Sequence, residues 1–226
     1  SLGTSRIGMA ISSDGIHFVK NPTPILFPTN DAFQKYEWPG GIEDPRVIET
    51  EDGKYLMTYT SYDGKTARLC SAISSDLLQW EKLGPMLSHP KYINTWSKSG
   101  AIVGKEINSR IIAQKIEGYY WMYFGDTDLF MAKSTDLRNW EVCENAENQM
   151  KISVLHPRMG YFDSRLVEPG PYALLRPEGI LLIYNASNAA NFNESKFPKF
   201  TYAAGQALFD ANKPYKLVNR TNQAFI

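Results

Sequence analysis

The side chains best suited to chemistry in this sequence lie in three short segments that combine acidic and basic residues. Asp44 and Arg46 lie in GGIEDPRV, Lys98 lies in WSKSG, and Asp163 and Glu168 lie in FDSRLVEPGP. Cleavage of a glycosidic bond needs such a set, because one carboxylic acid protonates the departing oxygen while a second group activates water or attacks the anomeric carbon. The paired carboxylates therefore make sugar chemistry the first hypothesis for this chain.

Metal and cofactor chemistry, by contrast, is not indicated. Cys70 and Cys143 are the only cysteines, too few for a disulfide framework and without the spacing of metal ligands. The three histidines form no HxH or HExxH pattern. We expect a protein that uses neither a metal nor a cofactor.

The overall composition favours an uncharged ligand. Lysine and arginine together number 24, and so do aspartate and glutamate, so no net charge attracts nucleic acid or an anionic membrane. The sequence has no apolar run long enough to cross a bilayer and no targeting signal, so we expect no membrane insertion. The alternatives of a bacterial cytoplasmic or periplasmic location stay open, as does assembly into a homo-oligomer.

The elements that position these side chains repeat along the chain about every 60 residues. AISSDGIHF begins at Ala10, AISSDLLQW at Ala72 and AKSTDLRNW at Ala132. In each copy an alternating strand runs into Ser or Thr followed by Asp, and an aromatic residue comes after the turn. Each copy therefore predicts a strand, a turn and a second strand.

A second motif with the same period places a glycine turn before an apolar strand. Gly53 precedes YLMTYT, Gly118 precedes YYWMYF and Gly179 precedes ILLIY. These runs are apolar on both faces, so each strand must be covered on both sides. With a shorter strand before each, this predicts units of three or four antiparallel strands stacked face to face, as in a β-propeller. A β-sandwich is the alternative, although it does not require such a period.

We expect residues 1–226 to form a single all-β domain comprising about three and a half blades of a five-bladed β-propeller. Residues 1–20 would supply only the outer hairpin of one blade. The first inner strands and a last blade are therefore expected outside this chain.

The first strand of each propeller blade lines the central channel, so distant polar residues should meet there. Asp44, Lys98, Asp163 and Glu168 belong to such segments and should converge. Successive side chains of a regular strand point to opposite faces, so Glu43 should face away from Asp44 unless a bulge turns it inward.

Several motifs together resemble glycoside hydrolase family 130, the β-mannoside phosphorylases and β-1,2-mannosidases. GGIEDPRV is similar to the family signature GxEDPR, and TSRIGMAISSDGIHF, YTSYDG, WSKSGAIV, YWMYFGD, FDSRLVEPGP and LLIYNAS fall in the family order. The resemblance spans nearly the whole chain and implies a five-bladed β-propeller that acts on mannosides. It also implies that Asp44 is the catalytic acid, which delivers its proton through the 3-hydroxyl of the mannosyl residue, and that Arg6 contacts the sugar.

Two departures from the phosphorylase pattern favour hydrolysis. Asn185 stands in YNA where a phosphate-binding histidine would be expected, and Glu168 stands in VEPGP where phosphorylases resemble GGGPP. A carboxylate there would repel phosphate and could act as the general base that activates water. We therefore expect an inverting, exo-acting β-1,2-mannosidase with Asp44 as acid and Glu168 as base. The alternatives are a β-mannoside phosphorylase producing mannose 1-phosphate and a propeller that binds glycans without cleaving them.

The remaining polar candidates would hold the substrate. The predicted substrate-binding residues are Arg6, Arg46, Asp63, Lys98, Asp126, Asp163 and Asn185. Lys98 could also pair with Glu168, and the three aspartates are as well suited to shaping turns as to contacting sugar. Trp96 and Phe162 are possible platforms for a sugar ring, although a place in the core is favoured for both.

Overall fold

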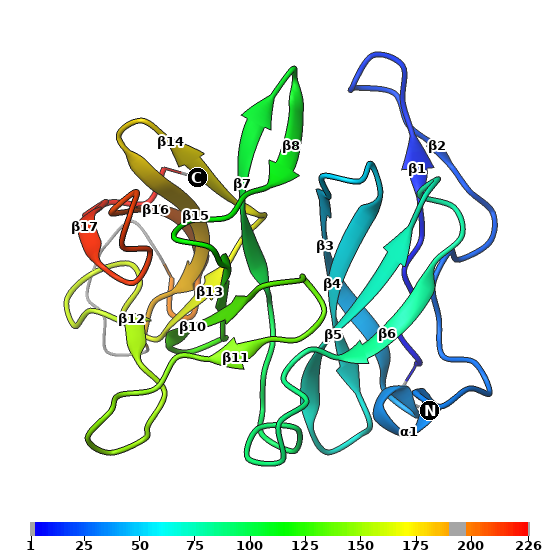
Figure 1. The fold of residues 1–226 in the computed structure, drawn as a ribbon, viewed down its shortest axis with the longest axis horizontal. Coiled ribbons are helices and arrows are strands. Elements are labelled where there is room, and N and C mark those ends of the chain that lie inside the picture. The colour runs from blue at the N-terminus through cyan, green and yellow to red at the C-terminus, as the bar shows by residue number, and fades with distance from the viewer. Residues whose placement is uncertain (1–2, 190–197, 226) are drawn as a thin grey trace.

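The computed structural model describes residues 3–189 and 198–225, and within these residues the fold is almost entirely β (Figure 1). The only helix in the described part, α1 (Gln34–Glu37), is a single turn. The prediction of an all-β protein is therefore confirmed.

The first unit is an antiparallel sheet whose strands follow one another in chain order. Its strands are β3 (Gly41–Glu49), β4 (Tyr55–Tyr62), β5 (Ala67–Ser74) and β6 (Glu81–Pro85). Strand β4 is buried continuously from Leu56 to Ser61, as its apolar pattern on both faces predicts. It lies in the middle of the unit and is covered on both sides.

Two further units of the same kind follow along the chain. The second unit consists of β7 (Ala101–Ile107), β9 (Tyr120–Phe124), β10 (Leu129–Ser134), β11 (Glu141–Val142) and β12 (Ser153–Leu155). The third unit consists of β13 (Leu166–Pro169), β14 (Ala173–Arg176), β15 (Gly179–Ser187), β16 (Tyr202–Phe209) and β17 (Leu217–Arg220). In the second unit β10 pairs with β9, β11 and β12, and in the third both β13 and β14 pair with β15.

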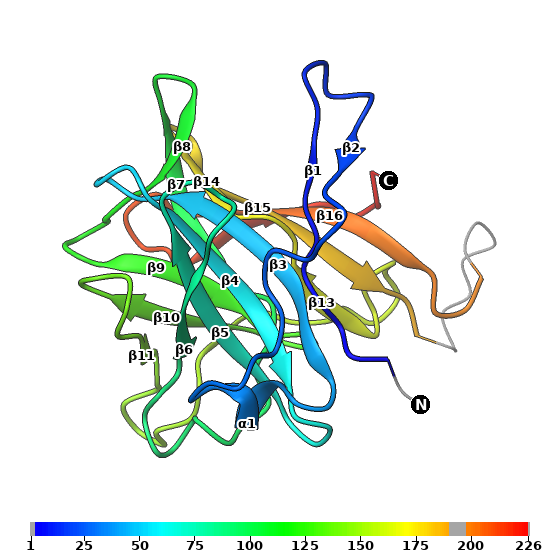
Figure 2. The same cartoon turned by 90° about the vertical axis from the view of Figure 1, so that its right-hand side faces the viewer.

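The first strands of the three units lie next to one another, which is what positions the candidate site. The start of β7 pairs with β9, and its end pairs with β8 (Arg110–Ala113). Strand β14 runs parallel to β7, and β8 runs parallel to β3 (Figures 1 and 2). The segments that lead into β3, β7 and β13 are thereby gathered from distant parts of the sequence.

The apolar side chains pack between neighbouring units. One buried cluster joins the second and third units, where the rings of Tyr123 and Phe209 lie 4.6 Å apart. Another joins the first and second units through residues such as Leu69 and Met122. This packing agrees with the predicted stacking of sheets, because each sheet buries its apolar faces against the next.

The repeated Ser and Asp motifs form the predicted turns. Ser134 Oγ accepts the backbone N–H of Asp136 and of Leu137, and Asp136 Oδ1 accepts the N–H of Asn139 at 2.8 Å. Leu137 has a φ of 64°, which the surrounding hydrogen bonds hold in the left-handed region. The copy at Ser74 to Trp80 makes the corresponding bonds.

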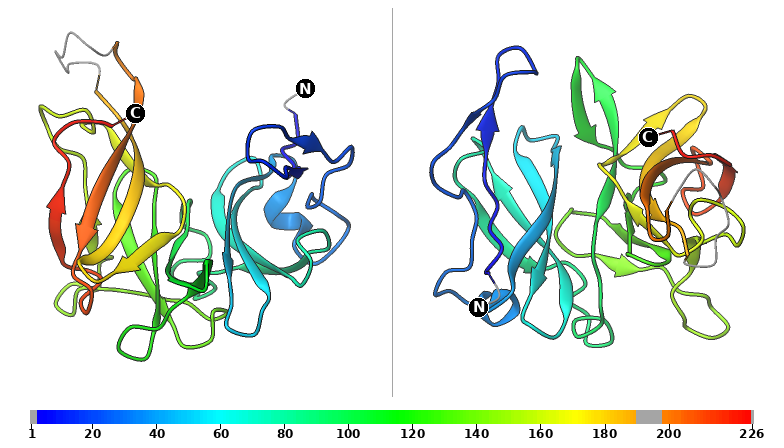
Figure 3. Two further views of the ribbon diagram at one scale, coloured as in Figure 1. Left: turned by 90° about the horizontal axis from the view of Figure 1, so that it is seen from above. Right: turned by 180° about the vertical axis from the view of Figure 1, so that it is seen from behind.

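A separate hairpin of β1 (Ala10–Ile11) and β2 (Val19–Lys20) projects from the same side of the molecule as the β7–β8 hairpin (Figures 1, 2 and 3). Its apolar side chains are exposed, with Ile16 and Val19 each 77% accessible. Within the described residues the larger sheet does not close on itself. The number of blades and the closed propeller therefore stay predictions.

Candidate active site

A β-bulge at the start of β3 sets the position of Asp44. Glu43 pairs with Thr60 and Arg46 pairs with Thr58, so two residues of β3 oppose a single residue of β4. Asp44 itself has a φ of 55°, in the left-handed region that a regular strand does not use. The bulge breaks the alternation of side chains at this point of the strand.

Lys98 lies next to two acidic side chains at the bulge, those of Asp44 and Glu43. Its Nζ lies 3.3 Å from Asp44 Oδ2 and 4.0 Å from Glu43 Oε1. Glu43 therefore does not face away from Asp44 as it would in a regular strand, because the bulge, the alternative that the sequence left open, brings both carboxylates to the same cation. Burial lowers the pKa of Lys98, but the charges of Asp44, Glu168 and Glu43 outweigh it and hold the pKa above its ordinary value.

Glu168 is tied to the residue that follows Lys98. The hydroxyl of Ser99 donates a hydrogen bond to Glu168 Oε1. Ser99 has a φ of 55°, so the chain turns sharply between Lys98 and β7. The dipeptide of Lys98 and Ser99 thus contacts Asp44 through one residue and Glu168 through the next, and it brings the predicted acid and base into one cluster.

Arg46 makes a second connection between the same two segments. Its Nη1 donates to the backbone oxygen of Asp44 at 2.9 Å, and its Nη2 donates to that of Pro169 at 2.6 Å. Its Nε donates to the oxygen of Gly170. Burial lowers the pKa of Arg46, and the carboxylates of Glu168 and Asp44 act against this shift. The guanidinium therefore holds backbone, and contact with substrate stays a prediction.

Arg6 and Asn185 flank this cluster from two other segments. Ser5 hydrogen-bonds to the backbone of Gly40 and Ile42, which lays the segment before Arg6 alongside β3. The Arg6 side chain is exposed, and its guanidinium lies 5.7 Å from the centre of the Phe27 ring. Asn185 is exposed on β15. It lies directly opposite Glu168, so a sugar at Glu168 could also reach its amide.

Two of the predicted aspartates are occupied elsewhere in the fold. Asp63 caps the turn after β4, where it accepts the backbone N–H of Lys65 and Thr66 and a 2.6 Å ion pair from Arg68. Burial raises the pKa of Asp63, but these hydrogen bonds outweigh it and keep the pKa below its ordinary value. Asp63 therefore shapes a turn, and a role in sugar binding stays a prediction.

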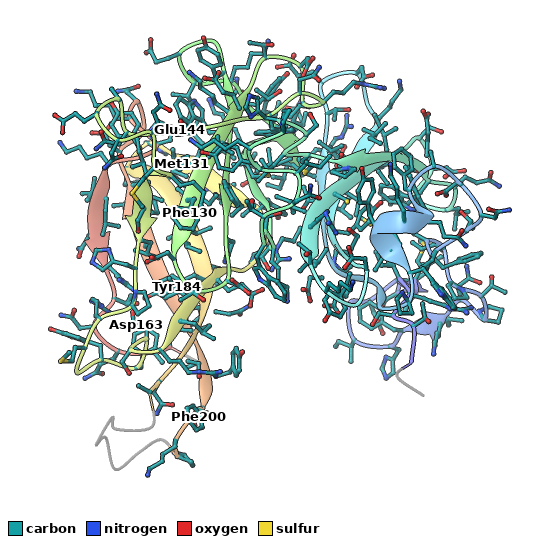
Figure 4. All side chains as sticks on the ribbon, turned by 90° about the horizontal axis from the view of Figure 1, so that it is seen from below. Phe130, Met131, Glu144, Asp163, Tyr184 and Phe200 are labelled. Atoms are coloured by element: carbon teal, nitrogen blue, oxygen red, sulfur yellow. The ribbon has the colours of Figure 1, made fainter. Side chains whose placement is uncertain are left out.

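Asp163 does not join the cluster. It is completely buried in the third unit, where its carboxylate pairs with Arg158 at 2.9 Å and with Arg220 at 2.6 Å. It also accepts the hydroxyl of Tyr184, which lies beside it in Figure 4. Asp163 precedes β13 and turns into the unit, where the half-buried guanidinium of Arg158 and the buried one of Arg220 balance its buried charge.

The predictions that place two aromatic residues in the core have different outcomes. Phe162 is buried as predicted, at 3% exposure. Trp96 is not in the core, because 48% of it is exposed and its indole N–H donates to Asp126 Oδ2 at 2.7 Å. The signal that could have placed Trp96 outside is its position in WSKSG, two residues before Lys98.

The charges of the cluster favour chemistry on a neutral ligand. Three carboxylates, those of Glu43, Asp44 and Glu168, face two cations, Lys98 and Arg46. A cavity of about 930 Å³ lies elsewhere, at the outer strands of the second unit around Tyr119, Trp121 and Trp140. In the described part of the chain no group of three or more metal-ligating side chains is present. No helix of the described residues could span a bilayer.

Comparison with known proteins identifies the family. A family model described as beta-1,4-mannooligosaccharide phosphorylase, that of glycoside hydrolase family 130, matches residues 1–226. The 1,2-beta-oligomannan phosphorylase of Thermoanaerobacter sp. (strain X514) is 28% identical over 225 residues, which cover 98% of this chain and 64% of that protein. A solved glycosyl hydrolase from Bacteroides ovatus has a TM-score of 0.96 at 40% identity, over 100% of this chain and 64% of that one.

A further solved structure represents family members described as glycoside hydrolases that target beta-1,2 mannosidic linkages in Candida mannan. It has a TM-score of 0.95 at 43% identity, over 99% of this chain and 63% of that one. The chain spans less than two-thirds of the length of each of these relatives. Because the family model matches the chain from end to end and solved members share its fold, the chain belongs to glycoside hydrolase family 130, a family of enzymes that act on mannosides.

Proposed function

We propose that this protein hydrolyses β-1,2-linked mannosides with inversion at the anomeric centre and removes one sugar at a time from the chain end. Asp44 acts as the acid and Glu168 as the base. The observation that carries this proposal is that Lys98 pairs with Asp44 while the adjacent Ser99 holds Glu168. Two carboxylates from strands far apart in sequence are thereby available to one bound sugar.

The two carboxylates would divide the reaction between them. Asp44 supplies a proton to the departing oxygen through the 3-hydroxyl of the mannosyl residue, and Glu168 takes a proton from the attacking water. In an inverting enzyme a water must fit between the sugar and the base, so the carboxyl groups are separated by ~6.5–9.5 Å. Ser99 fixes the rotamer of Glu168 and leaves its second oxygen for this water.

The charge of the cluster supports water over phosphate as the nucleophile. At ~4 Å and an effective dielectric constant near 20, two like unit charges repel by about 4 kcal/mol, which is roughly a thousandfold in affinity. Two cations of the cluster are already engaged, Lys98 with Asp44 and Arg46 with backbone oxygens. Glu168 adds a further negative charge where a phosphate would approach.

The relatives support the two reactions unequally. The solved structure described in terms of hydrolases that target beta-1,2 mannosidic linkages is 43% identical to this chain, whereas the oligomannan phosphorylase is 28% identical. The phosphorylase is the second candidate, because the family model and the curated relatives carry that description. In that case Lys98 would have to exchange Asp44 for phosphate.

The product formed with and without phosphate tests the proposal. The complete natural protein is incubated with β-1,2-mannobiose, and we expect free mannose at the same rate in both conditions. Mannose 1-phosphate formed only with phosphate would establish the phosphorylase instead, and binding without turnover would indicate a glycan-binding protein. In the Glu168→Gln variant we expect kcat to fall at least about a hundredfold, with Glu178→Gln as an exposed control.

We also propose that the three units belong to a five-bladed β-propeller. The exposed apolar residues of the β1–β2 hairpin, Ile16, Phe18 and Val19, support this reading, since a further sheet packed on the hairpin would cover them. A crystal structure of the complete natural protein tests it. Five sheets around one axis are expected, and any other number would contradict the proposal.

A further inference from the structure

Trp96 presents a large aromatic face to solvent although the fold could have buried it. It is 48% exposed, whereas Trp121 and Trp140 are at most 9% exposed; Trp38, at 56%, is the other strongly exposed tryptophan. A single exposed aromatic residue needs no explanation by itself. Trp96 differs because several contacts hold its ring in one orientation.

One hydrogen bond of the ring itself and two of the next residue fix the position of Trp96. The indole N–H donates to Asp126 Oδ2 at 2.7 Å, which anchors the polar edge. The next residue, Ser97, points into the protein, where its hydroxyl accepts the N–H of Leu69 and its backbone N–H donates to Ala67. A side chain held in this way loses little conformational entropy when it binds a ligand.

The direction of the chain puts Trp96 on the same side as Lys98. Ser97 is buried at 4% exposure, and neighbours on either side of an inward-pointing residue in extended chain point outward together. Trp96 therefore shares a side with Lys98, which is 3.3 Å from Asp44. Two residues of extended chain span at most about 7 Å, roughly the length of one sugar ring.

A second aromatic side chain reaches Trp96 from the other strand of the site. The ring of Tyr62 lies 6.3 Å from that of Trp96, edge to face. Tyr62 pairs with Gly41, two residues along β4 from the pair of Thr60 with Glu43. Tyr62 on β4 and Trp96 in the segment before β7 therefore each lie two residues along the chain from a residue of the charged cluster or its strand partner.

Polar groups line the edge of the same surface. Asp126 Oδ1 makes no hydrogen bond among the described residues, so it is free to accept one from a ligand. Lys151 lies close enough to Asp126 and Asp128 for their charges to raise its pKa, although burial outweighs them and lowers it. A flat apolar face bordered by hydrogen-bonding groups is the usual composition of a site for a sugar ring.

We propose that Trp96, supported by Tyr62 and Asp126, is the binding platform for the sugar on the leaving-group side of the bond that is cleaved. This inference rests on the proposed function, since it assumes that Asp44 marks the point of cleavage. The ligand is a neutral pyranose, a second mannosyl residue in the simplest case. Trp96 would then determine the preference for an oligosaccharide over a mannoside with a small leaving group.

Two substrates that differ only in the leaving group test the platform. In the complete natural protein we expect Trp96→Ala to lower kcat/KM for β-1,2-mannobiose at least tenfold, and to change kcat/KM for β-mannosyl fluoride at most twofold, because fluoride cannot reach the ring. Trp96→Phe keeps an aromatic face and should retain at least half of the activity that Trp96→Ala loses. Tyr202→Ala, which removes an exposed aromatic residue of β16, is the control and should change neither.

The outcomes separate this inference from the proposed function. If the parent protein cleaves neither substrate by hydrolysis, the proposed function is wrong. If the parent hydrolyses both and Trp96→Ala affects them equally, or affects neither, the platform is wrong while the function stands. Thermal unfolding of each variant identifies a folding defect. If Trp96→Ala has such a defect, the kcat/KM values of Trp96→Phe on the two substrates are compared with those of the parent instead.

Discussion

The guanidinium of Arg46 donates a 2.6 Å hydrogen bond to the backbone oxygen of Pro169, 123 residues further along the chain. The same side chain holds the backbone oxygen of Asp44 at 2.9 Å. Since Glu168 directly precedes Pro169, the spacing between the proposed acid and base depends on this one planar group. A fork with several donors suits the task, whereas an ammonium group offers no fixed geometry.

Replacing Arg46 by lysine should therefore impair both stability and activity. The variant keeps the charge but loses bonds to two of three carbonyl oxygens, and we expect the free energy of unfolding to fall by about 2 kcal/mol. We expect kcat/KM on β-1,2-mannobiose to fall about tenfold or more, because a displacement of about 1 Å is enough for such losses. Denaturant titration and steady-state kinetics measure the two effects. Arg176→Lys, an exchange at an exposed arginine of β14, is the control. Equal effects in the two variants would contradict the inference that Arg46 sets the spacing between Asp44 and Glu168.

Removal of the Lys98 charge should move the pH dependence of catalysis. Lys98 is the cation shared by Asp44, Glu43 and Glu168, and it stays protonated because these carboxylates raise its pKa. Without it the carboxylates repel one another, and ionisation becomes harder for each. We expect Lys98→Met to shift both limbs of the pH profile of kcat/KM to higher pH and to lower the maximum. An unchanged profile, equal to that of the exposed control Lys105→Met, would argue against the cluster.

The glycine at the start of β3 should not tolerate a side chain. Gly41 has a φ of +103°, and an added Cβ would lie 2.3 Å from the backbone nitrogen and oxygen of Ser5. Gly53 also has a positive φ, of +77°, but nothing lies within 4 Å of its Cβ position. We expect Gly53→Ala to cost about 1 kcal/mol through backbone strain alone. Gly41→Ala should cost about 3 kcal/mol or more and should displace Arg6 from the site; similar losses in both would show that crowding by Ser5 does not matter.

The repeated turns should make stability depend on acid pH. Burial raises the pKa of Asp136, but its hydrogen bonds with Asn139, Arg138 and Ser134 together outweigh this effect and lower the pKa from 3.8 to about 2. A carboxylate with a lowered folded pKa stabilises the fold above its unfolded pKa, and this stabilisation is lost as the pH falls from about 4 towards 2. Because the turn is exposed, we expect Asp136→Ala to cost only about 1 kcal/mol at pH 7.

Denaturant titration across this range checks the sign of the effect. The difference in free energy of unfolding between the parent and Asp136→Ala should become smaller as the pH falls below 4. The exposed control Glu147→Ala should show little difference at any pH. A difference that stayed constant with pH would mean that packing, and not the ionised carboxylate, stabilises the turn.

Much of this fold could be predicted because its signals are local. The hydrogen bonds of Asp136 reach residues two or three positions away, so the turn can be recognised within a few letters of sequence. The apolar runs of β4, β9 and β15 likewise indicate strands covered on both faces; β4 and β9 are buried as expected, whereas Leu181 and Ile183 of β15 are only half-buried. The position of Asp44, Lys98 and Glu168 near one another followed from the repeat and from the family resemblance.

The predictions that failed concern long-range contacts. Asp163 is buried because two arginines, one of them on β17, need a counter-charge inside the third unit. Glu43 joins Lys98 because β3 is bulged and not regular at this point, a choice that the alternation of residues left open. Trp96 is exposed because its indole N–H donates a hydrogen bond at the surface to Asp126, which follows β9 in the chain.

By itself, the sequence determined the repeating strands, the turns between them and the residue types of the site, since these depend on neighbours a few positions apart. Only the tertiary structure decided which carboxylates share a cation at the site and which are buried in structural ion pairs. Such choices depend on the free energy of burying a charge, and that free energy is known only when the partners brought by distant strands are in place.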